Sequence, residues 1–303
     1  MLRLNNARII AKIFQEVVLQ MSIQHFYYLT AYFLLYSFLG WVLEVAFHAL
    51  CKGTIVNRGF LNGPVCPIYG IGMLSVIVLL SPLKHHLFLL FICGTAFATL
   101  IELVGGFVLY KLFHMRWWDY SKEPFNLGGY ICARFSLAWG FCILFAVLIV
   151  HPVVELNVYI MDRPLGYVFV AVCYALFVAD CIITVLTIAK LNTKLKRLNR
   201  LGTEMRGFSD DLTEKIAQRS LDAGVKIQEG RVQSALAKSE LEDEFNMLRL
   251  QLAEHRHYSY GRLLRAFPNI NHREYNDELA DIIKYMKKRR AESLLLRREK
   301  RKA

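Results

Sequence analysis

Five apolar segments, each close to the length that crosses a bilayer, constrain this chain of 303 residues more than any other feature. A helix needs about 20 apolar residues to span the hydrocarbon core of a membrane. The segments are Phe26–Leu50, Val65–Leu83, Leu87–Leu112, Tyr130–Val150 and Leu165–Ala189. Prolines stand near their boundaries, and Pro152 and Pro164 are predicted to bracket the last turn. We predict an all-α, polytopic integral membrane protein with about five transmembrane helices.

The chain divides after Lys190 into two parts of different composition. Residues 1–190 carry 12 Lys/Arg and 8 Asp/Glu, whereas residues 191–303 carry 25 and 17. The final part therefore supplies two thirds of the net charge of +12. We expect a membrane domain over residues 26–190 and a basic helical tail over residues 191–303. This division excludes an ordinary soluble enzyme, a secreted disulfide scaffold and a disordered chain.

Residues 1–25 form a separate segment in which apolar and basic residues alternate with helical spacing. Ile9, Ile13 and Val17 fall on one face, while Arg3 and Arg8 add positive charge. Such a pattern is typical of an amphipathic helix that lies at a membrane interface. The alternative interpretation is that Met21 is the natural start of the protein.

The distribution of basic residues among the loops predicts the orientation. The first loop carries Lys52 and Arg58, and the third loop is also basic, whereas the second has only Lys84 and the fourth only Arg163. Positive charge accumulates in short loops on the cytoplasmic side. We therefore expect a multi-pass protein of the cell membrane, with the C-terminus and loops one and three in the cytoplasm and the N-terminus outside.

Among the ionisable residues inside the predicted spans, four stand out, because each costs several kcal/mol in hydrocarbon unless it is paired. They are Glu44, Glu102, Arg134 and Asp180. At about 1.5 Å per residue the three acids lie at similar depth, so the sequence predicts one polar network with Arg134 as the counter-charge. We favour polar contacts between helices as its role. The other interpretation is a site for a cation, a proton or a charged substrate.

The two loops that we expect in the cytoplasm contain the other candidate residues. Asn57 and Arg58 lie in the first loop, and Trp117, Trp118 and Asp119 lie in the third. Loops of this composition can fold back onto the helices or contact a partner. For the two tryptophans we favour a place in the aromatic belt at the membrane interface.

The tail is predicted to contain separate helices. Leucines at residues 191, 195, 198 and 201 extend the fifth span, but glycines interrupt the pattern further on. A hairpin or an oligomer contact fits this better than a long coiled coil. Basic runs at residues 287–290 and 297–302 suit anionic lipid beside a membrane. A solvated helix face is the plainer alternative, and nucleic acid is a less favoured partner.

Several chemical motifs are missing from the sequence. It contains no GxxxxGK[ST], HExxH or GxSxG, so we expect no enzyme activity and no ATP hydrolysis by a P-loop in this chain. Its cysteines form no CxxC pair and no metal-binding spacing. We therefore expect neither a cofactor nor a metal.

Six motifs between residues 30 and 140 stand out. They are Tyr36–Trp41 with Glu44, Asn57–Leu61, Gly63–Gly70, Trp117–Ser121, Asn126–Gly129 and Phe135–Gly140, and the tail adds Arg262–Asn269. Together they resemble the bacterial ABC-transporter type IV (CmpB-like) membrane family. The resemblance implies a permease-like inner-membrane protein. Because the chain has no P-loop, an ABC-type function would need a separate ATPase, and a homo- or hetero-oligomer is also plausible. The resemblance implies no catalytic residues. A membrane scaffold or regulator that acts through its tail is the alternative.

Overall fold

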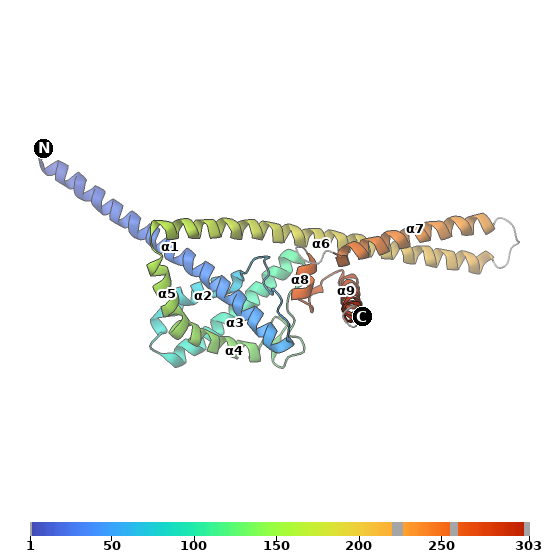
Figure 1. Cartoon of the computed structure of the whole chain (residues 1–303), viewed down its shortest axis with the longest axis horizontal. Coiled ribbons are helices and arrows are strands. Elements are labelled where there is room, and N and C mark those ends of the chain that lie inside the picture. The colour runs from blue at the N-terminus through green and yellow to red at the C-terminus, as the bar shows by residue number, and fades with distance from the viewer. Residues whose placement is uncertain (1, 220–226, 255–259, 300–303) are drawn as a thin grey trace. The chain divides into compact units, whose positions relative to one another are not determined.

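The computed structural model describes residues 2–219, 227–254 and 260–299, and it describes side chains within residues 23–207, 236–252, 260–289 and 291–292. Its helices are α1 (Leu2–Lys52), α2 (Pro67–Leu80), α3 (Leu87–Phe113), α4 (Ala133–Phe145), α5 (His151–Ile160), α6 (Pro164–Arg219), α7 (Ile227–Glu254), α8 (Tyr260–Ala266) and α9 (Asn276–Glu299) (Figure 1). Its two-residue strands are β1 (Met115–Arg116), β2 (Asn126–Leu127), β3 (Ile131–Cys132) and β4 (Asn271–His272). The predicted all-α fold class is confirmed.

Four helical stretches are long and apolar enough to cross a membrane. They are Ile23–Lys52, Leu87–Phe113, Ala133–Ile160 and Pro164–Gly207. The second predicted span forms a shorter apolar helix, Pro67–Leu83, which ends in a 3-10 turn. The backbone of Cys66 is extended, and the helix begins at the next residue, Pro67. A proline at the first helical position favours a helix start there. Within the described part of the chain there are therefore four long apolar helices and one short one.

The predicted break before Pro152 is wrong. The fourth span continues from α4 through a π-helical turn, Ala146–Val150, into α5. A proline inside a helix lacks an N–H donor and clashes with the preceding turn, and a π turn relieves both problems locally. The chain consequently turns at residues 161–163, just before Pro164.

The chain forms two compact units. Unit 1 contains residues 1–108 and 119–183, and unit 2 contains residues 109–118 and 184–303. The core of unit 1 is built from α1, α5 and α6, and its buried members are Tyr27, Ala31, Tyr32, Tyr36, Val154, Val158 and Val170. Many large apolar side chains of unit 1 point outward, including Phe88 and Leu165, which are 80% and 81% exposed. Outward apolar side chains are what a helical bundle in lipid requires.

Small residues allow α1 and α2 to approach closely. A Cβ atom added at Gly70 would lie 2.1 Å from Ser37 Oγ and 2.6 Å from the backbone oxygen of Phe33. On the same helix, a Cβ atom at Gly72 would meet only Ile101 Cδ1, at 3.8 Å. Close packing at small residues is a common way for helices to associate in membranes.

We expect Gly70→Ala to lower the free energy of unfolding by about 1–3 kcal/mol, since overpacking forces the two helices apart. Gly72→Ala is the matched control, because its new methyl group finds ordinary van der Waals space. Thermal unfolding of both variants in detergent measures the difference. Equal loss in both variants would contradict the packing that the structure has between α1 and α2.

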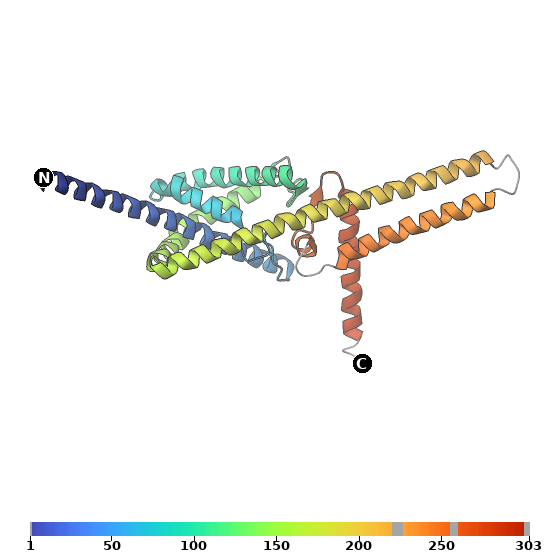
Figure 2. The ribbon, with the colours of Figure 1, turned by 90° about the horizontal axis from the view of Figure 1, so that it is seen from above.

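Unit 2 is a helical module with its own core. α7 lies alongside the C-terminal part of α6 (Figure 2), and Arg197 of α6 forms an ion pair with Glu244 of α7. This is the predicted hairpin, although α6 runs through Gly202 and Gly207 without a break. Its core contains the predicted leucines together with residues of α7, α8 and α9: Leu191, Leu195, Leu198, Leu201, Leu248, Leu252, Leu263, Leu264, Leu279 and Ile282.

The N-terminal segment continues directly into the first span. α1 begins at Leu2 and runs to Lys52 as one helix. The side chains that make up the predicted apolar face of residues 1–20 lie outside the described residues, as do all side chains of the basic run at residues 297–302. The amphipathic character of the first and the lipid contact of the second stay predictions.

Candidate functional site

Glu44 and Glu102 belong to one polar cluster in unit 1. Glu44 lies on α1, accepts a hydrogen bond of 2.7 Å from the Tyr69 hydroxyl of α2, and lies 3.5 Å from Nε of Arg58. Glu102 lies on α3 and accepts a 3.0 Å hydrogen bond from the Tyr120 hydroxyl. The Glu44 charge acts electrostatically on Glu102. We call Glu44, Tyr69, Glu102 and Tyr120 the carboxylate–tyrosine cluster.

The two carboxylates have different surroundings. The Glu44 side chain is 27% exposed and has Arg58 as a counter-charge. Glu102 is 8% exposed, and its buried Oε2 atom has no hydrogen-bond partner of standard geometry among the described side chains. A buried carboxylate oxygen that accepts no hydrogen bond is costly. The cluster therefore contains one neutralised acid and one acid that is not neutralised.

Packed rings hold the two tyrosines in place. Tyr120 stacks on Phe135, with ring centroids 4.8 Å apart, and Tyr69 meets Trp139 edge-on at 5.7 Å. Burial, reinforced by the nearby negative charge of Glu102, raises the pKa of the Tyr120 hydroxyl. This hydroxyl therefore stays protonated and donates its hydrogen bond over the whole physiological range.

Asp180 holds the first loop against α6. Its Oδ1 atom accepts hydrogen bonds from the backbone N–H of Asn62, at 3.1 Å, and from the Asn62 side-chain amide, at 2.9 Å. Its Oδ2 atom accepts a third from the N–H of Gly63, at 2.7 Å. A carboxylate with several backbone donors is well satisfied in a buried setting. The structure therefore uses this predicted site residue to anchor a loop.

Asn57 shapes the same loop from within. Its Oδ1 atom accepts hydrogen bonds from the indole N–H of Trp41, at 2.7 Å, and from the N–H of Gly59, at 2.9 Å. Its Nδ2 atom donates to the backbone oxygen of Asn62, at 2.8 Å. With Asp180, these contacts fold the loop back onto the helices, which places Arg58 beside Glu44.

The predicted pairing of Arg134 with the intramembrane acids is wrong. Arg134 lies in the first turn of α4, its side chain is 74% exposed, and its Nη1 atom lies 3.7 Å from Glu123. An arginine near a helix end extends toward the polar side, because its long stem allows the charge to leave the apolar region. Arg58, which sequence reasoning placed only among the loop candidates, supplies the counter-charge instead.

Trp117 corrects a second prediction. It is 5% exposed, meets Phe267 of the tail edge-on at 5.1 Å, and lies near Phe113. Beside it, β1 pairs antiparallel with β4, with Met115 opposite His272 and Arg116 opposite Asn271. Trp117 is therefore part of the core of unit 2 and not of an interfacial belt, because the tail returns to cover it.

The two neighbours of Trp117 have other surroundings. Trp118 is half-buried. Asp119 stabilises a turn, since its Oδ1 atom accepts hydrogen bonds from the backbone N–H of Ser121, at 2.9 Å, and from the Ser121 hydroxyl. The third loop thus divides between the two units after Trp118.

His272 organises the start of α9. Its Nδ1 atom accepts hydrogen bonds from the backbone N–H groups of Glu274 and Tyr275, at 3.1 and 3.0 Å. Burial lowers the pKa of this imidazole below its ordinary value of 6.5, with a smaller lowering by His114 and an opposing effect of Glu274. Protonation at Nδ1 would remove both hydrogen bonds.

We expect the stability of unit 2 to fall as the pH drops through about 6.5. Because the folded state disfavours the charged imidazole of His272, the unfolded chain binds more protons there, and acid favours unfolding. His272→Asn keeps an acceptor oxygen but does not titrate, so it should flatten this dependence. Hydrogen exchange of residues 260–285 at several pH values measures it. Equal slopes in both proteins would contradict this role for His272.

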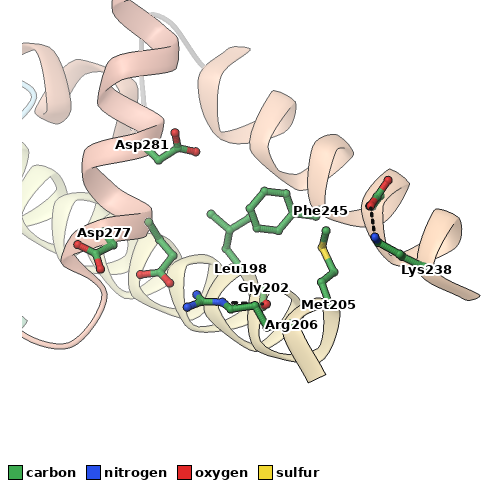
Figure 3. A pocket seen from close by; sticks show the side chains of 10 residues that line it. Leu198, Gly202, Met205, Arg206, Lys238, Phe245, Asp277 and Asp281 are labelled. Carbon is green, nitrogen blue, oxygen red and sulfur yellow. Dashed lines mark hydrogen bonds and ion pairs between the residues drawn. The ribbon is translucent and has the colours of Figure 1, made fainter. Parts of the chain in front are cut away.

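Unit 2 also has an open groove of about 440 Å³ at the start of α9 (Figure 3). Leu198, Met205 and Phe245 form its apolar part. Its charges are largely compensated, since Lys238 pairs with Glu242 and Arg249 pairs with Asp281. The acids in the first turn of α9 stabilise the positive end of the helix dipole. The charged residues around the groove are thus explained by their ion pairs and by the helix dipole, without a ligand.

The side chains that the structure describes include no group of three His, Cys, Asp or Glu residues arranged to hold a metal ion. Sequence reasoning also missed Tyr69 and Tyr120, the two hydroxyl donors of the cluster. A usable signal was present, since Tyr69 lies just after the glycine-containing first loop, and Tyr120 lies in the third loop two residues after Trp118.

The family model described as "Putative ABC-transporter type IV" matches residues 31–185. The match covers about half of the chain and includes every candidate residue discussed above from Glu44 to Asp180. The tail, with its Arg262–Asn269 motif, lies outside it. No curated protein and no solved structure matches the chain.

Proposed function

The chain belongs to the ABC-transporter type IV family, and from that premise we propose that it is the permease-like membrane component of a bacterial transport system. Its apolar helices and its family indicate a membrane location. Since the sequence has no P-loop, a separate ATPase supplies the energy, and the chain itself carries out no catalysis.

The observation that carries the proposal is the construction of unit 2. Two membrane helices, α3 and α6, end in it or pass through it. The tail contacts the segment that follows α3 through the β1–β4 pairing and the Trp117–Phe267 contact. It contacts α6 through Lys194, which donates a 3.4 Å hydrogen bond to the Tyr260 hydroxyl. The two membrane helices are also joined to each other, since Asn192 of α6 donates a 3.1 Å hydrogen bond to the backbone oxygen of Phe113. A partner that moves the tail therefore moves the ends of two membrane helices, as coupling to an ATPase requires.

The proposal includes an orientation and partners. Unit 2 faces the cytoplasm, as do loops one and three, and the N-terminus lies outside. The basic tail contacts anionic lipid, with about 1 kcal/mol gained per charge near the surface. Four long apolar helices are few for a complete translocation pathway, so the chain works in a homo- or hetero-oligomer. A reporter fused at Lys84 tests the orientation, because a cytoplasmic signal there would reverse it.

Purification of the tagged full chain from native membranes tests the proposal. We expect ATP hydrolysis to co-purify with the chain, and Trp117→Ala to reduce it at least severalfold by loosening unit 2. Arg200→Ala is the matched control, since Arg200 is an exposed member of an ion pair with Glu204. If no ATPase co-purifies with the wild-type chain, a transport component of this type is ruled out.

A membrane scaffold that acts through its tail is the second candidate. The observation in its favour is that Asp180 and Glu44 have full sets of structural partners in unit 1. Neutralisation of Glu44 and Glu102 separately, with protein level monitored, distinguishes the two functions. Transport requires a flux that depends on at least one acid in variants that still fold. The scaffold requires a phenotype that depends on residues 203–303.

A further inference from the structure

We propose that Glu102 is a proton-binding carboxyl group, which takes up a proton on Oε2 and releases it again inside unit 1. This inference goes beyond the proposed function. It concerns a chemical property of one residue, and it holds or fails whether or not the chain transports anything.

The first step is the balance of charge. Glu44 is compensated by Arg58, at 3.5 Å. Among the residues that the structure describes, the neighbours of Glu102 include the Tyr120 hydroxyl and the Trp139 side chain as donors, and no cationic side chain is paired with it. At 8% exposure, an ionised carboxylate without a counter-charge is strongly disfavoured, and the simplest remedy is a bound proton.

The second step identifies the atom. Tyr120 donates to Oε1, so that oxygen already has a hydrogen and serves as the carbonyl oxygen of the neutral acid. Among the described residues, none makes a hydrogen bond of standard geometry to the buried Oε2 atom. The proton that binds therefore comes to Oε2, converting the carboxylate and one proton from water into a neutral carboxylic acid. The reverse step returns the proton to water and restores the negative charge.

The third step distinguishes a proton from a metal ion. A metal ion needs several oxygen ligands, and the described side chains contain no group of three suitable residues. Glu44 is already engaged by Arg58. The packing is also tight, because a Cβ atom at Gly40 would lie 2.2 Å from the Tyr69 ring and one at Gly105 would lie 2.9 Å from Ile68. A proton adds no volume.

The groups that face Glu102 explain why the proton can leave again. Tyr120 donates a hydrogen bond that favours the ionised form, and the Trp139 side chain is a second donor that favours it, while the Glu44 charge opposes that form. Arg58 offsets the Glu44 charge and so weakens this opposition. Glu102 is thus held between a desolvated site that favours the acid and a hydrogen bond that favours the carboxylate. These opposing influences permit uptake and release.

Infrared difference spectroscopy on the purified full chain in lipid nanodiscs, stepped from alkaline to acidic buffer, tests the proposal. We expect the C=O stretching band of a buried carboxylic acid in the wild type, and its loss in Glu102→Gln. Glu123→Gln is the matched control, since Glu123 is a loop carboxylate paired with Arg134, and the band should persist in it. A band that survives in Glu102→Gln, or no titrating band in the wild type, overturns the proposal.

Tyr120→Phe provides a second test that keeps the carboxyl group and does not depend on the folding of Glu102→Gln. Loss of the hydroxyl removes the hydrogen bond to Oε1, so the C=O band should move to higher frequency. The midpoint of its titration should also rise by about one pH unit, because the ionised form loses a hydrogen bond of ordinary strength. An unchanged band and midpoint in a folded Tyr120→Phe protein contradict the proposal.

Discussion

Replacement of Trp117 by alanine is expected to lower the free energy of unfolding of unit 2 by about 3–5 kcal/mol, the range for truncating a buried aromatic side chain. Trp117 is 5% exposed and packs between Phe113, at the end of α3, and Phe267 of the tail. Its loss leaves a cavity where the third loop and the tail meet. The neighbouring β1–β4 pairing is then held by only two residues on each strand.

Hydrogen exchange of residues 260–272 measures this effect, because these residues should exchange much faster in the variant. Trp117→Phe keeps the edge-on ring contact and should retain most of the protection. Trp118→Ala is the matched control, since the adjacent tryptophan is only half-buried. If protection of the tail is unchanged in Trp117→Ala, then Trp117 does not hold the tail as the structure indicates.

Asp180→Ala is expected to cost about 3 kcal/mol or more in unit 1. The substitution leaves three donors from Asn62 and Gly63 without an acceptor, and each unsatisfied buried donor costs about 1–3 kcal/mol. Because the loop is partly exposed to water, the total loss of stability stays below the sum of the costs of three fully buried donors. Asp180→Asn retains one acceptor oxygen, so its loss should be intermediate.

Thermal unfolding in detergent gives the stability change, and modification of Arg58 by a dicarbonyl reagent reports on the loop. Arg58 is held beside Glu44, so release of the loop should increase its reactivity severalfold. Asp119→Ala, which removes a carboxylate from a turn in the other loop, serves as the control. Unchanged Arg58 reactivity in Asp180→Ala would show that Asp180 does not anchor the loop.

The predicted spans agree with the helices because a stretch of about 20 apolar residues has few alternatives in a bilayer. The exceptions have local causes. Pro152 stays inside the fourth span because a π turn accommodates it, and the second span is shorter because Cys66 is extended before Pro67. The length and composition of a segment predict that it spans the membrane, but they do not predict the backbone conformation of a single turn within it.

The partners of the candidate residues were harder to predict. Depth along each helix placed the acids at similar levels, but their contacts depend on how far the loops fold back. Arg58 reaches Glu44 because Asn57 and Asp180 bend the first loop, a result of hydrogen bonds between residues up to 118 positions apart. The β1–β4 pairing involves only two residues per strand, which is too short to produce a pattern in the sequence.

The β1–β4 pairing has a consequence for how the protein is made. It joins Met115 to His272, so the partner of β1 is synthesised 157 residues later. At about 5–20 residues per second, this corresponds to roughly 10–30 s of translation. During that time the helices from α4 to α8 are made while Met115 and Trp117 lack the cover that the tail provides. The last part of unit 2 to be synthesised thus completes a core whose first residues were made before half of the chain existed. A chain that ends before β4 leaves Met115 and Trp117 as an exposed apolar surface.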